Sequence, residues 1–261
     1  MSTQAYDIVK LARSNKRPTG LDYIQNLCGD FLELHGDRCY ADDAAIVGGV
    51  GHFRGIPVTF VAIEKGHSAK ERMSRFFGAP HPEGYRKALR LMRQAEKFHR
   101  PVLCFVDTSG AYCGIGAEER GQGQAIAENL MGMMSLNTPV ITLLIGEGGS
   151  GGALALAVAD EVWMMQNAIY SILSPEGFAS ILWKDGKRAP EAAEVMKLTA
   201  GDLKELGIVE EIVEEPGEFT VDTMPVVCEE LRGKILRFLE KYEKMDGEEL
   251  VEERYRRFRD M

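Results

Sequence analysis

Two glycine-rich segments have the residue types and the position that suit anion chemistry. Loop 1 (residues 109–116) and loop 2 (residues 146–152) each follow an apolar run typical of a buried strand. In open α/β sheets, ligands bind where a parallel strand ends and a helix begins. A helix start offers unpaired N–H donors and a positive dipole end, and glycine lets a ligand approach the backbone closely. Either loop could therefore hold a phosphate or stabilise an oxyanion.

A nucleotide site is one interpretation of loop 2, because Gly146, Gly148 and Gly151 fit the G-x-G-x-x-G pattern. The acid that binds the ribose should end the next strand, about 20 residues further on. Asp160 and Glu161 come before that strand begins. The sequence also contains no G-x-x-x-x-G-K-[ST] motif, which excludes a P-loop.

A serine hydrolase is a second interpretation, because residues 148–152 fit G-x-S-x-G with Ser150 on the turn. In that fold the order is Ser, acid, His, and every histidine of this chain precedes Ser150. A pair of Ser150 with Lys65 remains an alternative. The pattern favours Ser150 as a helix N-cap, which is a common position for serine.

The other polar residues near the loops have ordinary structural explanations. No residue in the sequence pattern supplies a base for Cys113, which favours a small side chain in a turn. Glu118 and Glu119 suit the first turn of a helix, and Arg120 stays open as an anion contact. No spacing indicates a metal site. Two loops of backbone donors without a nucleophile suit stabilisation of an enolate or tetrahedral oxyanion at an acyl thioester.

Composition restricts the class of protein further. The chain has 261 residues and a net charge of −9. This charge argues against a nucleic-acid surface as its main purpose, because neutralising phosphates needs clustered Lys and Arg. A basic segment, residues 65–90, could still meet a phosphorylated small ligand. Five cysteines without C-x-x-C spacing favour a reducing cytoplasm over a disulfide framework. No apolar run approaches the roughly 20 residues that span a bilayer, so we expect neither export nor insertion.

Hydrophobic periodicity predicts one α/β core between helical ends. We expect a helical arm in residues 1–40, a core in residues 41–215 and a helical segment in residues 216–261. Within the core, a hairpin is followed by apolar strands that alternate with helices, which is typical of a parallel sheet covered on both faces. The predicted strands are residues 45–50, 56–63, 102–106, 140–145, 162–165 and 169–173. The predicted helices are residues 5–34 (broken at 17–20), 83–99, 118–134, 151–159, 175–183, 189–197 and 225–261.

Long motifs throughout residues 11–213 resemble one known family, the alpha subunit of the carboxyltransferase component of bacterial acetyl-CoA carboxylase. The resemblance rests on Leu11-Ala12-Arg13, Arg17-Pro18-Thr19, Leu21-Asp22-Tyr23-Ile24, Glu33-Leu34-His35-Gly36-Asp37-Arg38, Tyr40-Ala41-Asp42-Asp43, the 82–92 segment, Gly116-Ala117-Glu118-Glu119-Arg120-Gly121-Gln122, the 146–154 segment and Ser174-Pro175-Glu176-Gly177. Motifs of this length are far more specific than one glycine pattern.

The resemblance implies a crotonase-like (ClpP-related) superhelix of β-β-α units. It also implies a zinc-ribbon beta subunit in an alpha2beta2 assembly, together with a biotin carboxyl carrier protein and a biotin carboxylase. The implied reaction, the first step of fatty acid synthesis, moves CO₂ from carboxybiotin on the carrier to acetyl-CoA and gives malonyl-CoA. In that mechanism the biotin enolate takes the α-proton, so no protein side chain need act as a base.

By position, the resemblance implies that two pairs of adjacent backbone N–H groups are the catalytic donors: Gly114 with Ile115, and Gly151 with Gly152. Weaker candidates for substrate contacts are Lys65, Gly66, Arg86 and Arg120. The family usually has D-T-P-G-A-Y-P-G where this chain has Ser109 and Cys113 in place of the two prolines, and a G-H-Q-K-G stretch is altered at Glu64. None of these departures removes a backbone N–H.

Two other classes of function stay open from the residues. One is a self-sufficient crotonase-type acyl-CoA hydratase or hydrolase, and the other is a non-catalytic scaffold subunit. The chain carries no cysteine-rich zinc ribbon, which points to a separate partner and against self-sufficiency.

Overall fold

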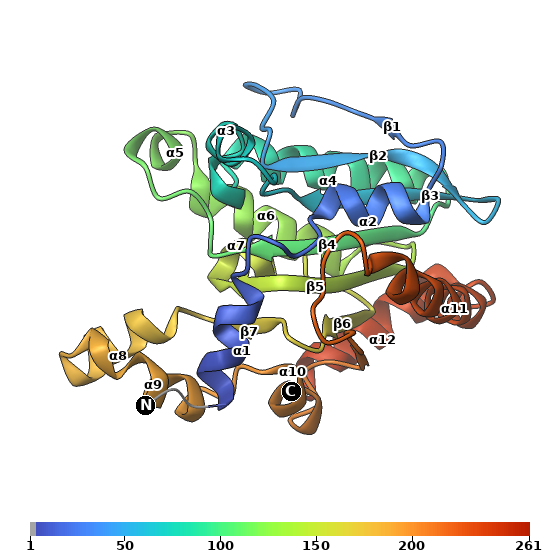
Figure 1. The fold of residues 1–261 in the computed structure, drawn as a ribbon. Coiled ribbons are helices and arrows are strands. Elements are labelled where there is room, and N and C mark those ends of the chain that lie inside the picture. Colours follow the sequence, from blue (N-terminus) through green and yellow to red (C-terminus); the bar gives the residue numbers. More distant parts are fainter. Residues whose placement is uncertain (1–3) are drawn as a thin grey trace.

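A single mixed sheet organises the chain (Figure 1). The structure is a computed structural model that describes residues 4–261. The strand order is β1-β2-β3-β4-β5-β6-β8, and β7 pairs with the end of β5. The first three strands are antiparallel, and the sheet is parallel from β3 onward. The strands are β1 (Leu32–Glu33), β2 (Ile46–Phe53), β3 (Ile56–Ile63), β4 (Val102–Thr108), β5 (Val140–Gly149), β6 (Glu161–Met165), β7 (Ile169–Ser171) and β8 (Glu211–Val213).

Helices cover both faces of this sheet (Figure 1): α2 and α11 lie on one face and α4, α6 and α12 on the other. Helices α8 and α9 project beside the sheet; α9 packs against α1, and α8 packs against α9. None of the helices within residues 4–261 is both long and apolar enough to cross a bilayer. The helices are α1 (Gln4–Ala12), α2 (Gly20–Leu27), α3 (Ala69–Ser74), α4 (Pro82–Lys97), α5 (Ile115–Glu119), α6 (Gln122–Met134), α7 (Ser150–Leu154), α8 (Pro175–Trp183), α9 (Ala189–Val195), α10 (Ala200–Glu205), α11 (Met224–Tyr242) and α12 (Gly247–Arg259), with short 3₁₀ turns at Phe76–Gly78 and Gly186–Arg188.

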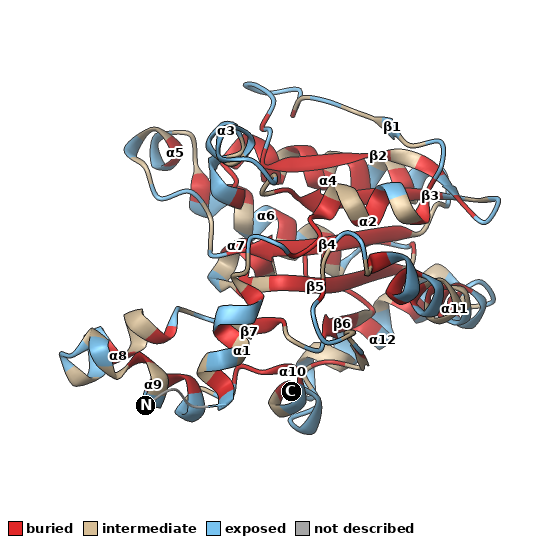
Figure 2. Cartoon of the chain, in the orientation of Figure 1, coloured by how far each residue is buried: buried red, intermediate tan, exposed pale blue. Residues whose placement is uncertain are grey.

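The central strands are buried along their length, as Figure 2 shows, which explains their unbroken apolar sequences. All seven residues of β4 are buried, because helices pack on both of its faces. The predicted hairpin is confirmed: β2 and β3 pair antiparallel around Arg54 and Gly55. Both turn residues have positive φ, 49° and 85°, which is the backbone of a type I′ turn.

Four sequence predictions need correction. The residues from Phe31 to Leu34 are not helical, because Leu32 and Glu33 pair with β2 as an edge strand. The helix predicted over 118–134 is two helices, because Gly121 has φ 82° and breaks the chain between α5 and α6. Helix α7 has only five residues rather than the nine predicted for 151–159. The tail predicted as one helical segment is two helices, α11 and α12.

The C-terminal helix α12 is anchored in the core by a buried ion pair. The Arg254 side chain is fully buried and donates to both carboxylate oxygens of Asp160 at 2.8 and 2.9 Å. Its remaining N–H groups donate to three backbone carbonyls that precede β5. Burial raises the pKa of Asp160, and the Arg254 charge opposes that rise. The tail therefore packs on its own domain.

Replacing this arginine should strongly destabilise the protein. Arg254→Ala leaves Asp160 and several carbonyls buried without a donor, and we expect a loss of about 3–5 kcal/mol in the free energy of unfolding. Urea unfolding followed by circular dichroism measures this loss. Arg256→Ala on the same helix is the control, because Arg256 pairs with Glu252 in the open; its effect should stay within about 0.5 kcal/mol. Equal effects of the two variants would contradict the assignment.

Candidate active site

The two predicted loops meet at the carboxyl edge of the parallel strands. The β4–β5 register places Thr108 opposite Gly148. A side chain on Gly149 would collide with the Ser109 carbonyl, and a Cβ on Gly152 would lie 2.5 Å from the Ala111 nitrogen. The backbones of the two loops are thus in direct contact, which only glycine permits at these positions.

Each loop ends in a short helix whose first N–H groups have no partner. Gly114 is the N-cap of α5 and Gly149 is the N-cap of α7. Across residues 4–261, no protein acceptor takes a hydrogen bond from the N–H groups of the four predicted donors. They are Gly114, Ile115, Gly151 and Gly152. Gly151 and Gly152 lie where the two loops contact each other, whereas Gly114 and Ile115 begin α5 further along loop 1 (Figure 1). The structure therefore presents two separate pairs of adjacent, unused donors.

Ser150 does not have the predicted N-cap role. It is the first residue of α7 and has φ 55°, an unusual conformation for a residue with a side chain. In residues 4–261, no hydrogen bond joins Ser150 to a histidine or to Lys65. Four of the five histidines instead face aspartates. The geometry gives the hydrolase hypothesis no activating base.

Two buried polar side chains donate hydrogen bonds to backbone carbonyls of the loops. The Tyr85 hydroxyl donates to the Gly152 carbonyl at 3.2 Å, and burial raises the pKa of this phenol well above its ordinary value. The Gln122 amide donates to the carbonyls of Tyr112 and Pro80 at 2.8 and 2.9 Å. The sequence patterns did not single out these two residues, although both lie in the long motifs.

An apolar cavity of about 660 Å³ opens beside loop 2. Ser150 and Gly151 line it on the loop side, and α8 forms part of the opposite wall. The rest of the lining is largely aliphatic and aromatic: Leu154, Tyr170, Ile172, Leu173, Phe178, Ile181, Leu182, Met196, Leu203, Leu206 and Ile208. A concave apolar surface next to a few backbone donors is the usual character of a small-molecule site.

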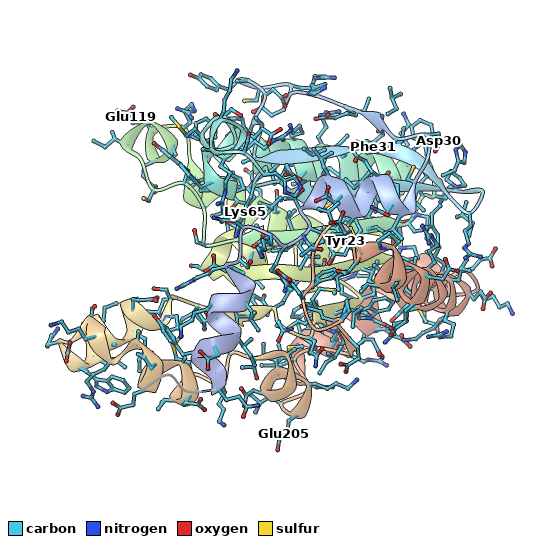
Figure 3. The ribbon with its side chains drawn as sticks, viewed as in Figure 1. Tyr23, Asp30, Phe31, Lys65, Glu119 and Glu205 are labelled. Atoms are coloured by element: carbon cyan, nitrogen blue, oxygen red, sulfur yellow. The ribbon has the colours of Figure 1, made fainter. Side chains whose placement is uncertain are left out.

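Lys65 lies near the middle of the sheet edge (Figure 3) and its charge is already paired. Its ammonium group is 2.6 Å from Asp107 and 3.5 Å from Glu147. Gly66 follows with φ 76°, and its N–H donates to Glu64. Burial raises the pKa of Glu64, whose other oxygen accepts from the Leu21 N–H. Lys65 and Gly66 thus join the end of β3 to the loops and to α2.

Arg86 and Arg120 are also paired with acids. Arg86 donates to Asp37 at 2.8 Å, and Arg120 donates to Glu83 with two nitrogens. Arg120 donates in addition to the Gly116 carbonyl at 2.6 Å, which fixes α5. We therefore assign both arginines to support of loop 1, and their direct contact with a bound anion stays a prediction.

The remaining candidates near loop 1 face solvent. Cys113, Glu118 and Glu119 are exposed, and Figure 3 shows Glu119 at the outer end of α5, away from Lys65. Within the described chain, residues 4–261, no group of three or more His, Cys, Asp or Glu side chains could hold a metal ion. That backbone donors carry the chemistry of the site stays a prediction.

Comparisons with known proteins identify the family of this chain. Residues 2–261 match the family model described as acetyl co-enzyme A carboxylase carboxyltransferase-like. The chain is 59% identical over 254 residues to the acetyl-coenzyme A carboxylase carboxyl transferase subunit alpha of Ruminiclostridium cellulolyticum, covering 97% of this chain and 96% of that protein. It is 58% identical over 254 residues to a protein of Natranaerobius thermophilus named for subunits beta/alpha, covering 97% of this chain and 42% of that longer protein.

Solved structures show the same fold at low identity. A transcarboxylase 12S structure superposes with a TM-score of 0.71 at 22% identity, covering 92% of this chain and 44% of that one. A Pseudomonas malonate decarboxylase hetero-tetramer in complex with coenzyme A gives 0.71 at 18% identity, covering 91% and 92%. These likenesses confirm the predicted crotonase-like fold. With the family model covering almost the whole sequence, the chain belongs to the acetyl co-enzyme A carboxylase carboxyltransferase-like family.

Proposed function

We propose that this chain is the alpha subunit of acetyl-CoA carboxylase carboxyltransferase and takes part in transfer of a carboxyl group to acetyl-CoA, giving malonyl-CoA. The observation that carries the proposal is the pair of contacting loops with four unused N–H donors, in a chain that matches the family from end to end. Preorganised N–H groups stabilise an oxyanion strongly because they need no reorganisation during the reaction.

The residues fit a biotin-dependent reaction. Bound carboxybiotin would supply both the CO₂ and the group that accepts the α-proton. This chain then needs to provide orientation and donors, and Gly114, Ile115, Gly151 and Gly152 provide them. The cavity beside Gly151 has an apolar lining, so a ligand that fills it would displace water and strengthen hydrogen bonds to a developing negative charge.

The second half of the site comes from another chain. Support for this comes from the relatives named for fused beta and alpha subunits, which join the two parts in one polypeptide. We propose an alpha2beta2 assembly with zinc in the beta subunit, working in the cytoplasm with a biotin carboxyl carrier protein and a biotin carboxylase. The cysteines of this chain are all free, which agrees with a reducing compartment.

The proposal predicts activity that depends on the partner. The purified chain should not decarboxylate malonyl-CoA in the presence of biocytin, whereas the chain assembled with a beta subunit should, because the donors of one subunit form only part of the site. Release of acetyl-CoA, followed by chromatography, measures the reaction. Assembly with a heat-denatured beta subunit is the control. Full activity of this chain alone would favour a self-sufficient acyl-CoA enzyme, and no activity of a stable assembly would favour a scaffold.

A further inference from the structure

Arg13 links three elements around loop 2. It lies directly after α1, and its Nε donates to Oε1 of Glu147 at 2.7 Å. Its two terminal nitrogens donate to the two carboxylate oxygens of Glu176 at 2.8 and 3.3 Å. Glu147 belongs to β5 inside loop 2, and Glu176 stands in the first turn of α8. One guanidinium therefore ties the N-terminal arm to the loop and to the cavity wall.

The link continues from loop 2 to loop 1. The second oxygen of Glu147 faces Lys65 at 3.5 Å, and Lys65 lies 2.6 Å from Asp107. Asp107 in turn accepts the Glu147 N–H at 2.8 Å, and only Thr108 separates Asp107 from loop 1. The two carboxylate oxygens of Glu147 therefore face different cations. Oε1 accepts from Arg13, and Oε2 faces Lys65.

Helix α8 is joined to the N-terminal arm through Glu176. It forms one wall of the apolar cavity through Phe178, Ile181 and Leu182, while loop 2 forms another through Ser150 and Gly151. Besides Arg13, the Tyr6 hydroxyl of α1 donates to Glu176 at 3.2 Å. Partial burial favours a higher pKa for Glu176. The hydrogen bonds from Arg13, the Glu176 backbone and Tyr6, together with the Arg13 charge, outweigh burial, and the pKa falls below its ordinary value. Glu176 is therefore ionised and held at neutral pH.

We propose that Arg13 is a positioning residue of the active site, which sets the distance between loop 2 and the α8 wall of the cavity. The role requires arginine, because its planar fork can donate to two carboxylates in fixed directions while an ammonium group is a single point charge. As a statement about catalysis, it rests on the proposed carboxyltransferase function. As a statement about geometry, it can be tested on the chain alone.

The test compares four variants of the full chain. Arg13→Gln removes the charge, Arg13→Lys keeps the charge without the fork, and Glu176→Gln removes only the α8 side of the link. Lys16→Gln is the matched control, because Lys16 follows on the same arm and pairs with Glu218 in the open, 2.6 Å away. Hydrogen exchange of the free chain is followed in residues 146–154 and 175–183. The kcat and KM of malonyl-CoA decarboxylation are measured in the assembly with the beta subunit.

We expect Arg13→Gln to speed exchange at least 5-fold in both segments and to lower kcat at least 10-fold, with KM for malonyl-CoA changing less than 3-fold. Arg13→Lys should recover part of kcat, Glu176→Gln should speed exchange mainly in 175–183, and Lys16→Gln should match the wild type. Unchanged exchange in both segments for Arg13→Gln would overturn the proposal. So would faster exchange spread evenly over the whole sheet, since that is general destabilisation. An inactive wild-type assembly would count against the proposed function, while the exchange data would still decide the role of Arg13.

Discussion

Gly152→Ala is expected to lower kcat of the assembled enzyme at least about 100-fold, the loss typical of one displaced oxyanion donor. A Cβ at this position would lie 2.5 Å from the Ala111 nitrogen, 2.8 Å from the Gly110 carbonyl carbon and 2.9 Å from the Tyr85 hydroxyl. Two of these atoms are backbone of loop 1, which cannot rotate away as a side chain can. The loops must separate, which displaces the Gly151 and Gly152 donors.

The measurement is malonyl-CoA decarboxylation by the assembly with the beta subunit, together with thermal unfolding of the variant. Gly123→Ala is the control, because nothing lies within 4 Å of the position that its Cβ would occupy and alanine favours a helix. It should leave kcat unchanged and the melting temperature equal or higher. A Gly152→Ala enzyme that is folded and turns over at the wild-type rate would show that contact between the loops is not needed.

Gly114→Pro should lower kcat by about 100-fold to 1,000-fold, because it deletes one of the unused N–H donors of loop 1. The backbone at Gly114 has φ −84° and ψ 152°, a conformation near the range of proline. The substitution therefore removes the hydrogen atom with little strain in φ. Steady-state kinetics should show a loss in kcat, since a donor to an oxyanion acts in the transition state.

Gly114→Ala separates the donor from the added bulk. Alanine keeps the N–H but carries the same Cβ, which would press on the Tyr112 ring just as proline would. A much smaller loss for alanine than for proline would assign the effect to the N–H group. Equal losses would instead assign it to displacement of Tyr112. Cys113→Ala is a second control from the same loop, and we expect it to turn over at nearly the wild-type rate because its thiol is exposed and carries no assigned role.

Local patterns predicted the strands well and the helix lengths less well. The hairpin of β2 and β3 and the apolar run of β4 lie close to the predicted residues, because a strand buried on both faces has an unbroken apolar sequence. The helix predicted over 118–134 is divided at Gly121. The turn at Gly121 places the Gln122 amide where it can donate to the Tyr112 carbonyl of loop 1. Residues 146–149 extend β5 rather than forming a free loop, because β4 and β7 pair with them.

The two glycine-rich loops were predictable from the sequence, because the conformation of a strand-to-helix turn is a local property. The choice of Gly114 and Gly152 as donors came from the family resemblance and stays a prediction. The roles of the charged residues were not predictable in this way. Lys65 and Arg120 are basic residues in a sequence, but whether such a charge is open to a ligand depends on the carboxylates that face it, here Asp107 and Glu83.

The sequence by itself therefore determined the two loops of this protein and, through its long motifs, the family. The tertiary structure alone decided which loops touch, where the apolar cavity opens and which charges are neutralised. Arg13 shows the reason: 134 residues separate it from Glu147 and 163 from Glu176, and no local pattern relates residues so far apart. Such contacts arise only when the sheet has brought its carboxyl edge, the N-terminal arm and α8 together.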